Sequence, residues 1–316
     1  MITWGINALN HDASIAVVSN GELVFWEKTS TYSGIPNDPL LTPEIITEAA
    51  IKGWPDEIVW FERPWLKKTR QLYAGQYRTA FDINELPKVY LKKMGLGQVP
   101  VKYLGHHETH ALSGFLTSPF DDATIVVIDA IGEWDTVSIW TGEGTRVKCI
   151  HRKLYPHSFG LFYSAFTELI DLTPVRDEYQ LQKYSENGAP NVFYDQVKSY
   201  WDRNLHRGIW DWPYPINNII DQQNIAAAVQ KVFEEKAQEV FDLAYRLTGS
   251  NNLVYMGGCA MNSLFNRRLE QQWKGIWSLP TPGDGSSSIG AALSAQNARI
   301  TWDRGLAKHI KIKYNR

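Results

Sequence analysis

The sequence is poor in cysteine, has no long hydrophobic run and carries almost no net charge. Only two of its 316 residues are cysteines, and both lie in apolar stretches, so a disulfide scaffold is excluded and a reducing compartment is expected. No apolar run reaches the roughly 18 residues of a membrane helix. We therefore expect a cytoplasmic protein with no signal peptide and no membrane partner. The formal net charge of −2 gives no sign of a broad surface for nucleic acid.

The strand pattern predicts an α/β protein with two similar lobes. Residues 2–8, 13–18 and 22–26 read as three strands, joined first by a polar turn and then by a hairpin turn at Asn20 and Gly21. Residues 124–128, 136–140 and 146–150 repeat this plan, again with an acidic turn after the first strand. The repeat indicates an internal duplication whose two acidic turns meet at a cleft.

We place the first lobe in residues 1–123 and the second lobe in residues 124–316. The first lobe is expected to contain helices that begin near residues 42 and 86, a buried strand at 57–61 and a short strand at 99–104. In the second lobe, an aromatic helix follows residue 156, and a long amphipathic helix covers residues 221–248. Residues 171–219 read as an insertion that shapes a pocket, with Trp201, Trp210 and Trp212 as an aromatic platform.

Three of the eight histidines stand within residues 106–110. A helix that begins near His106 places His106 and His110 one turn apart on the same face, so that both imidazoles can bind one metal ion. Asp129 ends the buried strand 124–128 and is the nearest third ligand, and Asp284 is the expected fourth. The alternative is a surface helix with solvated histidines and an aspartate that merely ends a strand.

Two glycine-rich stretches are candidates for nucleotide contact. Gly257 and Gly258 follow the strand 252–256, and a backbone without Cβ atoms can lie close to a ribose or a phosphate. The loop 280–288 opens a helix, and its amides and hydroxyls at Gly283, Gly285 and Ser286 can hold phosphate. A plain solvated loop is an equally good explanation of the second stretch.

A series of motifs runs in order through about residues 1–295. They are Gly5-Ile6-Asn7 with His11-Asp12-Ala13-Ser14, His106-His107-x-x-His110-Ala111 with Ser118-Pro119-Phe120, Asp129 with Gly132-Glu133, Ser158-x-Gly160-x-x-Tyr163, Gly257-Gly258-x-Ala260-x-Asn262, and Gly283-Asp284-Gly285-Ser286 with Gly290-Ala291-Ala292. Together they resemble the O-carbamoyltransferases of the nodulation-factor, tobramycin and cephamycin type. That resemblance implies the two-lobed actin-like, Hsp70-like, sugar-kinase-like (ASKHA) ATPase fold, close to the universal tRNA threonylcarbamoyl-adenosine factor.

The resemblance also implies roles for individual residues. A divalent metal, iron-like with manganese or magnesium as alternatives, is bound by His106, His110, Asp129 and Asp284 and holds phosphate oxygens of ATP or carbamoyl-adenylate. The nucleoside contact falls at Gly257, Gly258 and Asn262. The catalytic residues are His11 and Asp12, which face the transferred carbamoyl group and its hydroxyl acceptor. The original donor is carbamoyl phosphate.

Three departures from the family pattern affect these expectations. The family's second domain, which makes carbamoyl-adenylate, is absent from the 316 residues, so we expect a separate protein to supply the activated group, or a different donor. Gln180 stands where the family has a lysine, which removes any role of that lysine. The arginine-rich stretch that usually follows the first three strands is replaced by residues 27–30, which contain no arginine.

The acceptor is the least determined part of the prediction. Short stand-alone versions of this core resemble proteins of bacterial viruses, for which the expected acceptor is the hydroxymethyl group of 5-hydroxymethylcytosine, in DNA or as the nucleotide, in the host cytoplasm. Binding to DNA would then need a local basic patch, either Lys67, Lys68 and Arg70 or Lys88, Lys92 and Lys93. Alternatives are a small-molecule or sugar hydroxyl, a non-catalytic nucleotide-binding subunit, and a simple ATPase or sugar kinase. The sequence does not indicate an oligomeric state.

Overall fold

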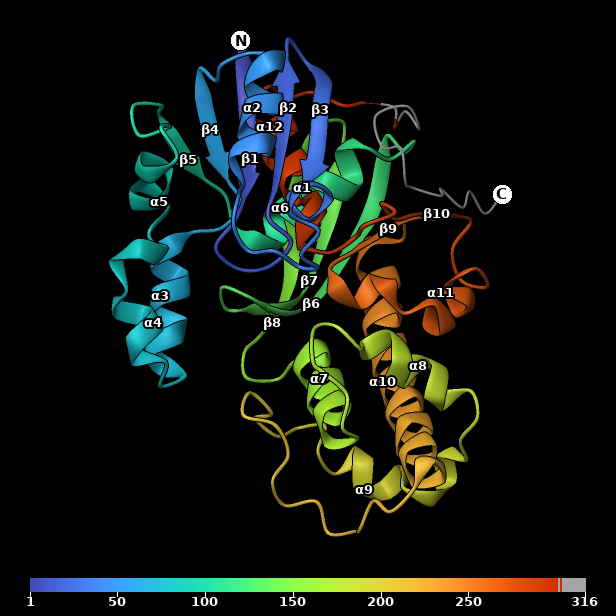
Figure 1. The fold of residues 1–316 in the computed structure, drawn as a ribbon. Helices are drawn as coiled ribbons and strands as arrows, with labels where there is room; N and C mark the ends of the chain where they lie inside the picture. The colour runs from blue at the N-terminus through green and yellow to red at the C-terminus, as the bar shows by residue number, and fades with distance from the viewer. Residues whose placement is uncertain (301, 303–316) are drawn as a thin grey trace.

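Two five-stranded mixed β-sheets form the frame of the computed structural model, which describes residues 1–300 and 302 (Figure 1). The first sheet has the order β3-β2-β1-β4-β5 and consists of β1 (Ile2–Asn7), β2 (Ser14–Ser19), β3 (Glu22–Lys28), β4 (Glu57–Trp60) and β5 (Val101–Tyr103). The second sheet has the order β10-β9-β6-β7-β8 and consists of β6 (Asp122–Gly132), β7 (Asp135–Glu143), β8 (Arg146–Leu154), β9 (Asn252–Met256) and β10 (Gly275–Trp277).

The two sheets have the same topology. In each, three consecutive strands form an antiparallel meander, and two later strands add in parallel beside the first strand of that meander. The predicted duplication of mixed-sheet lobes is therefore confirmed. Residues alternate between the faces of β6, since Ile125 and Val127 pack toward the first sheet while Val126 and Ile128 pack toward the other side.

Helices α6 (His106–Leu116) and α12 (Ser287–Ala295) lie between the two sheets (Figure 1). Two glycines allow the close packing. Gly5 of β1 lies against the backbone of Ser288, and Gly290 of α12 lies against the backbone of Ser113. Although the two sheets fall on either side of residue 123, α12 packs on the first sheet and α6 packs on the second. The exact division between lobes stays a prediction, and residues 301 and 303–316 of the predicted second lobe lie outside the described part.

The remaining helices and 3-10 turns are divided between the two halves of the chain. Beside the first sheet lie α1 (Ser30–Ser33), α2 (Pro43–Lys52), α3 (Pro64–Tyr73), α4 (Tyr77–Phe81), the 3-10 turn η1 (Ile83–Glu85) and α5 (Pro87–Lys93). The second half adds α7 (Phe159–Leu169), α8 (Glu178–Ser185), η2 (Pro190–Val192), α9 (Tyr194–Lys198), α10 (Ile219–Thr248), η3 (Gly258–Met261), α11 (Ser263–Leu269) and η4 (Asp284–Ser286). None of the helices described is long and apolar enough to cross a bilayer.

The expected aromatic platform does not form. The ring of Trp201 packs edge-on against Phe159 at 4.7 Å, and Trp212 packs against Phe166 at 5.9 Å, so both belong to the core built around α7 and α10. Trp210 alone stays exposed, with 85% of its surface accessible. The two inner indoles are partly buried because they pack on the aromatic side chains of α7 together with other apolar residues of the insertion, among them Val197, Tyr200 and Leu205.

We predict that Gly290→Ala destabilises the protein by about 3 kcal/mol, because overpacking of a close helix contact is costly. A Cβ at this position would lie 2.3 Å from the Ser113 backbone nitrogen, which cannot move without shifting α6. The matched control is Gly283→Ala, where the nearest atom to a new Cβ is 3.8 Å away. Urea unfolding of both variants measures the effect, and equal midpoints would contradict the packing argument.

Candidate functional site

Helix α6 begins at His106 and brings two imidazoles to one point. His106 and His110 are one helical turn apart, and their Nε2 atoms lie 3.1 Å from each other. Both side chains are buried, with at most 2% exposure. His107 points elsewhere, as predicted, and its Nδ1 lies 2.8 Å from the hydroxyl of Ser138.

Two carboxylates complete the cluster. Asp129 lies where the pairing of β6 with β7 becomes irregular, and Asp284 is the first residue of η4. Asp129 Oδ2 lies 3.2 Å from His106 Nε2 and 3.3 Å from His110 Nε2, and Asp284 Oδ1 lies 3.3 Å from each of these nitrogens. The four predicted metal ligands therefore lie together, with ligand atoms within 4.8 Å of one another.

The spacing of these atoms fits a metal ion. An ion bonded to imidazole and carboxylate at about 2.0–2.2 Å holds neighbouring ligand atoms about 3.0–3.5 Å apart. Both histidines turn Nε2 toward the cluster, and the Nδ1 of His110 faces the hydroxyl of Ser287 at 3.5 Å, which orients the ring. Two nitrogen and two oxygen donors suit divalent iron, manganese or zinc.

Electrostatics keep the carboxylates ionised. Burial would raise the pKa of Asp129, but the hydrogen bonds from His106 and His110 outweigh it and lower that pKa. Burial would likewise lower the pKa of His106, but the negative charge of Asp284 raises it well above the usual value. Without a metal, protons on the imidazoles balance the two carboxylates. A bound cation would displace those protons, so metal binding at this cluster is coupled to pH.

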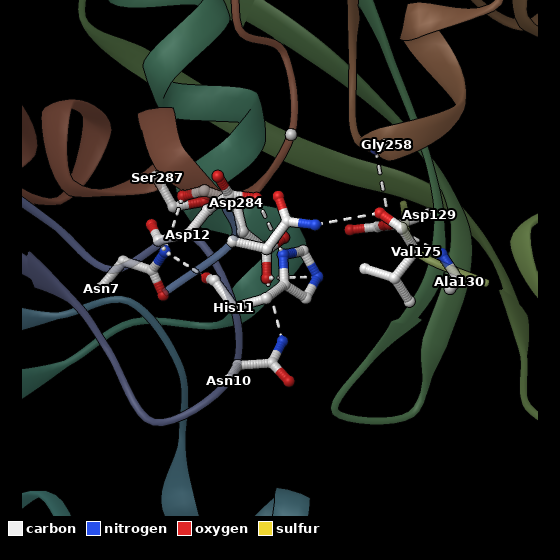
Figure 2. A network of polar contacts seen from close by, with 12 residues as sticks. Asn7, Asn10, His11, Asp12, Asp129, Ala130, Val175, Gly258, Asp284 and Ser287 are labelled. Atoms are coloured by element: carbon white, nitrogen blue, oxygen red, sulfur yellow. Dashed lines mark hydrogen bonds and ion pairs between the residues drawn. The ribbon is translucent and has the colours of Figure 1, made fainter. Parts of the chain in front are cut away.

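The turn between β1 and β2 places His11 and Asp12 beside the cluster (Figure 2). His11 Nε2 lies 3.5 Å from Asp284 Oδ2, and its Nδ1 lies 3.1 Å from Asp12 Oδ2. The negative charge of Asp284 raises the pKa of His11 to about 9. Because its side chain is 36% exposed, His11 forms the accessible edge of the cluster. At neutral pH the metal-free protein thus presents an imidazolium here.

Asparagines that had no predicted role hold this turn in place. Asn7 Nδ2 donates to the backbone carbonyls of Asp12 at 2.9 Å and Asp284 at 3.0 Å, and Asn10 donates to Asp284 Oδ2 at 2.9 Å (Figure 2). Lys28 of β3 forms a 2.8 Å ion pair with Asp12. Both asparagines stand in or beside the first motif, but their link to residue 284 depends on the tertiary fold.

A second contact joins the two halves of the chain. Asn37 Nδ2 donates to the carbonyl of Val175 at 3.0 Å, and Figure 2 draws Val175 with the residues of the polar network. The φ angle of Val175 is 68°, in the left-handed region that β-branched residues rarely adopt.

The predicted nucleoside residues lie beside the cluster and make contacts within the chain. Gly257 has a φ of 93°, and a Cβ there would lie 2.3 Å from the carbonyl of Ile128, so close packing explains this glycine. The Gly258 amide lies 3.4 Å from Asp129 Oδ1. Asn262 caps α11 through the amide of Phe265 and exchanges hydrogen bonds with Gln230. Their contact with a nucleoside stays a prediction.

The predicted phosphate loop is also well packed. The Gly285 carbonyl accepts from the Trp26 indole at 3.0 Å, and a Cβ on Gly285 would meet the Lys28 side chain. Ser286 is fully buried, and its hydroxyl donates to the carbonyl of Gly283 at 3.1 Å. These residues position Asp284, and their role in holding phosphate stays a prediction.

Glu133 is a buried carboxyl group to which we had assigned no role. It is 7% exposed, and it accepts a hydrogen bond from the Arg63 backbone amide. The adjacent Gly132 packs against the His106 ring. Burial raises the pKa of Glu133 to about 7, and the Arg63 hydrogen bond only partly offsets this. The motif contained this residue, but its burial could not be inferred from one acidic turn.

The first of the two expected basic patches does not form. Lys67 pairs with Glu62 at 2.8 Å, Lys68 is buried and donates to backbone carbonyls, and Arg70 is buried with a 2.7 Å bond to Gln76. These three side chains of α3 pack against the protein, where nearby carboxylate, carbonyl and amide oxygens accept their hydrogen bonds. Among the proposed phosphate contacts, only the three lysines of α5 remain exposed.

The comparisons with known proteins agree with the resemblance. The family model described as carbamoyltransferase N-terminus matches residues 3–293. The chain belongs to the carbamoyltransferase N-terminus family.

The relatives are distant and longer than this chain. An uncharacterized protein of Synechocystis sp. (strain ATCC 27184 / PCC 6803 / Kazusa) is 28% identical over 96% of this chain and 58% of its own length. Nodulation protein NolNO of Sinorhizobium fredii (strain NBRC 101917 / NGR234) is 24% identical over 62% of this chain and 31% of its own length. The chain therefore spans less than two thirds of the curated relatives it matches.

A solved structure supports the fold. The crystal structure of full-length HypF in its phosphate- and nucleotide-bound form matches 93% of this chain and 55% of HypF, with a TM-score of 0.51 and 15% identity. At this identity the likeness concerns the fold alone. Together with the duplicated sheets, it confirms the predicted two-lobed ASKHA architecture.

We predict that the protein, once stripped with a chelator, binds one equivalent of Fe²⁺ or Mn²⁺. Asp284→Asn should weaken binding by at least about tenfold, because it removes one charged ligand from the cluster. The matched control Asp121→Asn changes an exposed carboxylate outside the cluster and should leave binding unchanged. Calorimetric titration measures both, and equal affinities for the two variants would exclude this metal site.

We predict that Glu133→Gln stabilises the metal-free protein more at pH 8 than at pH 5. The folded-state pKa of Glu133 is raised from 4.5 to about 7, so ionisation of this group destabilises the fold progressively as pH rises through that window. The substitution removes this cost. The difference in the free energy of unfolding between Glu133→Gln and the unmodified protein should therefore grow by about 2 kcal/mol from pH 5 to pH 8. Urea unfolding in the presence of EDTA measures it, and a gain independent of pH would contradict the assigned pKa.

Proposed function

We propose that this chain transfers a carbamoyl group from carbamoyl-adenylate to a hydroxyl acceptor. The observation that carries the proposal is the buried group of two imidazole nitrogens and two carboxylate oxygens in a member of the carbamoyltransferase N-terminus family. In the reaction the acceptor hydroxyl loses its proton, its oxygen bonds to the carbamoyl carbon, and the bond from that carbon to the phosphate oxygen breaks. AMP leaves with the electron pair.

The residues of the site have distinct parts in this reaction. His106, His110, Asp129 and Asp284 hold the divalent ion, which when bound supplies positive charge for phosphate oxygens. His11 stands at the accessible edge, where it orients the acceptor hydroxyl and accepts its proton in the neutral form; a cation held at the cluster would counter the Asp284 charge that raises the His11 pKa. Asp12, held by Lys28, fixes the His11 ring through Nδ1.

The nucleoside part of carbamoyl-adenylate has a candidate place beside Asn262. A hollow of about 580 Å³ lies between α8, α10 and α11, with Gln230 and Arg268 in its wall. Gln230 bonds directly to Asn262, which links this hollow to the predicted nucleoside motif. We propose that ATP and carbamoyl phosphate are converted to carbamoyl-adenylate by a separate activating protein or domain, and that all steps take place in the cytoplasm.

For the acceptor we propose the hydroxymethyl group of 5-hydroxymethylcytosine, as the nucleotide in preference to DNA. The pairing of Lys67, Lys68 and Arg70 within the chain removes one of the two expected phosphate-contacting patches, which favours a small substrate over a duplex. A small-molecule or sugar hydroxyl is the second candidate acceptor, since the cluster itself selects no particular alcohol.

The test is a mass-spectrometric assay of carbamoyl transfer. The protein, Fe²⁺ or Mn²⁺ and enzymatically supplied carbamoyl-adenylate are incubated with 5-hydroxymethyldeoxycytidine monophosphate or with DNA that contains the base. We expect one carbamoyl group to be added to the nucleotide, and His110→Ala to lower the rate by at least about 100-fold. His157→Ala, at an exposed histidine outside the cluster, is the matched control.

His11→Ala separates an enzyme from a nucleotide-binding subunit. An enzyme should lose turnover in this variant and keep nucleotide binding, because His11 acts on the acceptor side of the cluster. Transfer to a sugar or another alcohol, but not to the modified nucleotide, would refute only the proposed acceptor. If neither acceptor class gains a carbamoyl group while ATP is hydrolysed, carbamoyl transfer is the wrong reaction.

A further inference from the structure

A second hollow, of about 380 Å³, lies where the end of α3 meets the segment that precedes α10. Its wall includes Tyr73 and Gly75 from the first half of the chain and His206, Arg207 and Trp210 from the insertion. The hollow therefore joins two parts of the sequence that are about 130 residues apart. It is distinct from both the metal cluster and the hollow near Asn262.

Two large aromatic side chains at this hollow remain exposed. Trp210 has 85% of its surface accessible and Tyr73 has 67%. The Tyr73 ring is held in place by Trp134 at 5.4 Å and by Tyr155 at 6.1 Å, so it needs little ordering on binding. Exposed aromatic faces are the groups on which planar rings stack, and the Tyr73 face is already held in position.

Arg207 is the one lining residue of the hollow with a permanent charge, and the Glu168 carboxylate lies behind the wall, next to Gly208. Arg207 takes part in none of the salt bridges among residues 1–300 and 302. Gly75 leaves room for the guanidinium, because a Cβ at that position would lie 3.2 Å from Arg207 Nη2. Burial is the main cause that lowers the pKa of His206, and the positive charges of Arg70 and Arg207 lower it further. A free arginine in such surroundings favours a phosphate group.

A chain of hydrogen bonds connects the hollow to the neighbourhood of the metal cluster. His206 Nε2 lies 3.1 Å from Gln76 Nε2, and Gln76 Oε1 accepts from Arg70 at 2.7 Å. Arg70 Nε in turn donates to the carbonyl of Glu133 at 3.3 Å, and the residue before Glu133 packs on His106. Tyr73 follows Arg70 by about one helical turn, so the exposed ring and the buried guanidinium of this hydrogen-bond chain are carried by the same helix, α3.

We propose that this hollow binds the phosphate and ring of the hydroxyl acceptor, with Arg207 on the phosphate and with Trp210 and Tyr73 against a planar base. The ligand class is a nucleoside monophosphate. The proposal rests on the proposed carbamoyl transfer only in calling the ligand an acceptor. Binding energy from this remote end would hold the reactive hydroxyl near His11 and the metal cluster.

The first experiment measures binding without turnover. Calorimetry in EDTA compares 5-hydroxymethyldeoxycytidine monophosphate with its nucleoside and with deoxyribose 5-phosphate. We expect the monophosphate to bind, and each of the other two to bind about tenfold more weakly, because one lacks the phosphate and the other lacks the ring. Equal affinity of deoxyribose 5-phosphate would overturn the stacking part, and no binding of the monophosphate would overturn the proposal.

Variants place the binding at this hollow. Trp210→Ala and Arg207→Ala both change exposed side chains. Each should weaken binding of the monophosphate by about tenfold, equivalent to about 1.4 kcal/mol. The matched controls are Trp65→Ala and Arg146→Ala, which are also exposed but lie outside the hollow. Affinities that do not differ between the two pairs would show that the nucleotide binds elsewhere.

Steady-state kinetics separates this proposal from the proposed function. In an active preparation, Trp210→Ala and Arg207→Ala should raise the KM for the acceptor by about tenfold and leave kcat near the wild-type value. An unchanged KM would refute the acceptor subsite while carbamoyl transfer stands. If the unmodified protein shows no transfer, carbamoyl transfer fails on its own, whatever the calorimetric result.

Discussion

The convergence of two imidazole nitrogens and two carboxylate oxygens is the interaction on which the rest of the structure depends. Burying two carboxylates is costly unless positive charge lies beside them. His106 and His110 provide it, and the pKa values of all four groups shift in the directions that keep the opposite charges paired. The partners come from α6, β6 and η4, so this balance ties the second sheet to α6 and to the turn before α12, while Asn7 of β1 adds a hydrogen bond to the Asp284 carbonyl from the first sheet.

The fold brings these groups together by close helix packing. Gly290 allows α12 to touch α6, and Gly114 allows α6 to touch Met256 of β9. α6 can then begin at the cluster and end in the core between the sheets. On the accessible side His11 remains reachable, and two separate hollows lie elsewhere, one between α8, α10 and α11 and one between the end of α3 and residues 204–210. This arrangement suits a reaction that joins a nucleotide-borne group to a separate acceptor.

Much of this could be predicted from local patterns. The repeated meander follows from strand alternation and glycine turns, and the pairing of His106 with His110 follows from helical spacing alone. Asp129 follows the strand 124–128, and Asp284 follows Gly283, and these positions make both residues candidate metal ligands from the sequence. Their convergence on the same point needed the family resemblance, since spacing along the chain does not fix a distance between residues 129 and 284.

What could not be predicted depends on contacts between distant segments. Trp201 and Trp212 were predicted to form an aromatic platform, but both are partly buried against the core around α7 and α10. Lys68 and Arg70 read as a basic patch, and only the packing of α3 against later residues reveals their internal partners. Val175 is held by Asn37 from 138 positions away, and nothing in either local sequence indicates that bond.

The central claim is that the four-residue cluster is a metal centre, and the most direct test is a crystal structure of the protein grown with Mn²⁺, with anomalous diffraction data. The account predicts one strong anomalous peak at about 2.0–2.2 Å from Nε2 of His106 and His110 and from oxygens of Asp129 and Asp284. A structure in which manganese binds elsewhere, while these nitrogens and oxygens stay in direct contact with one another, would contradict it.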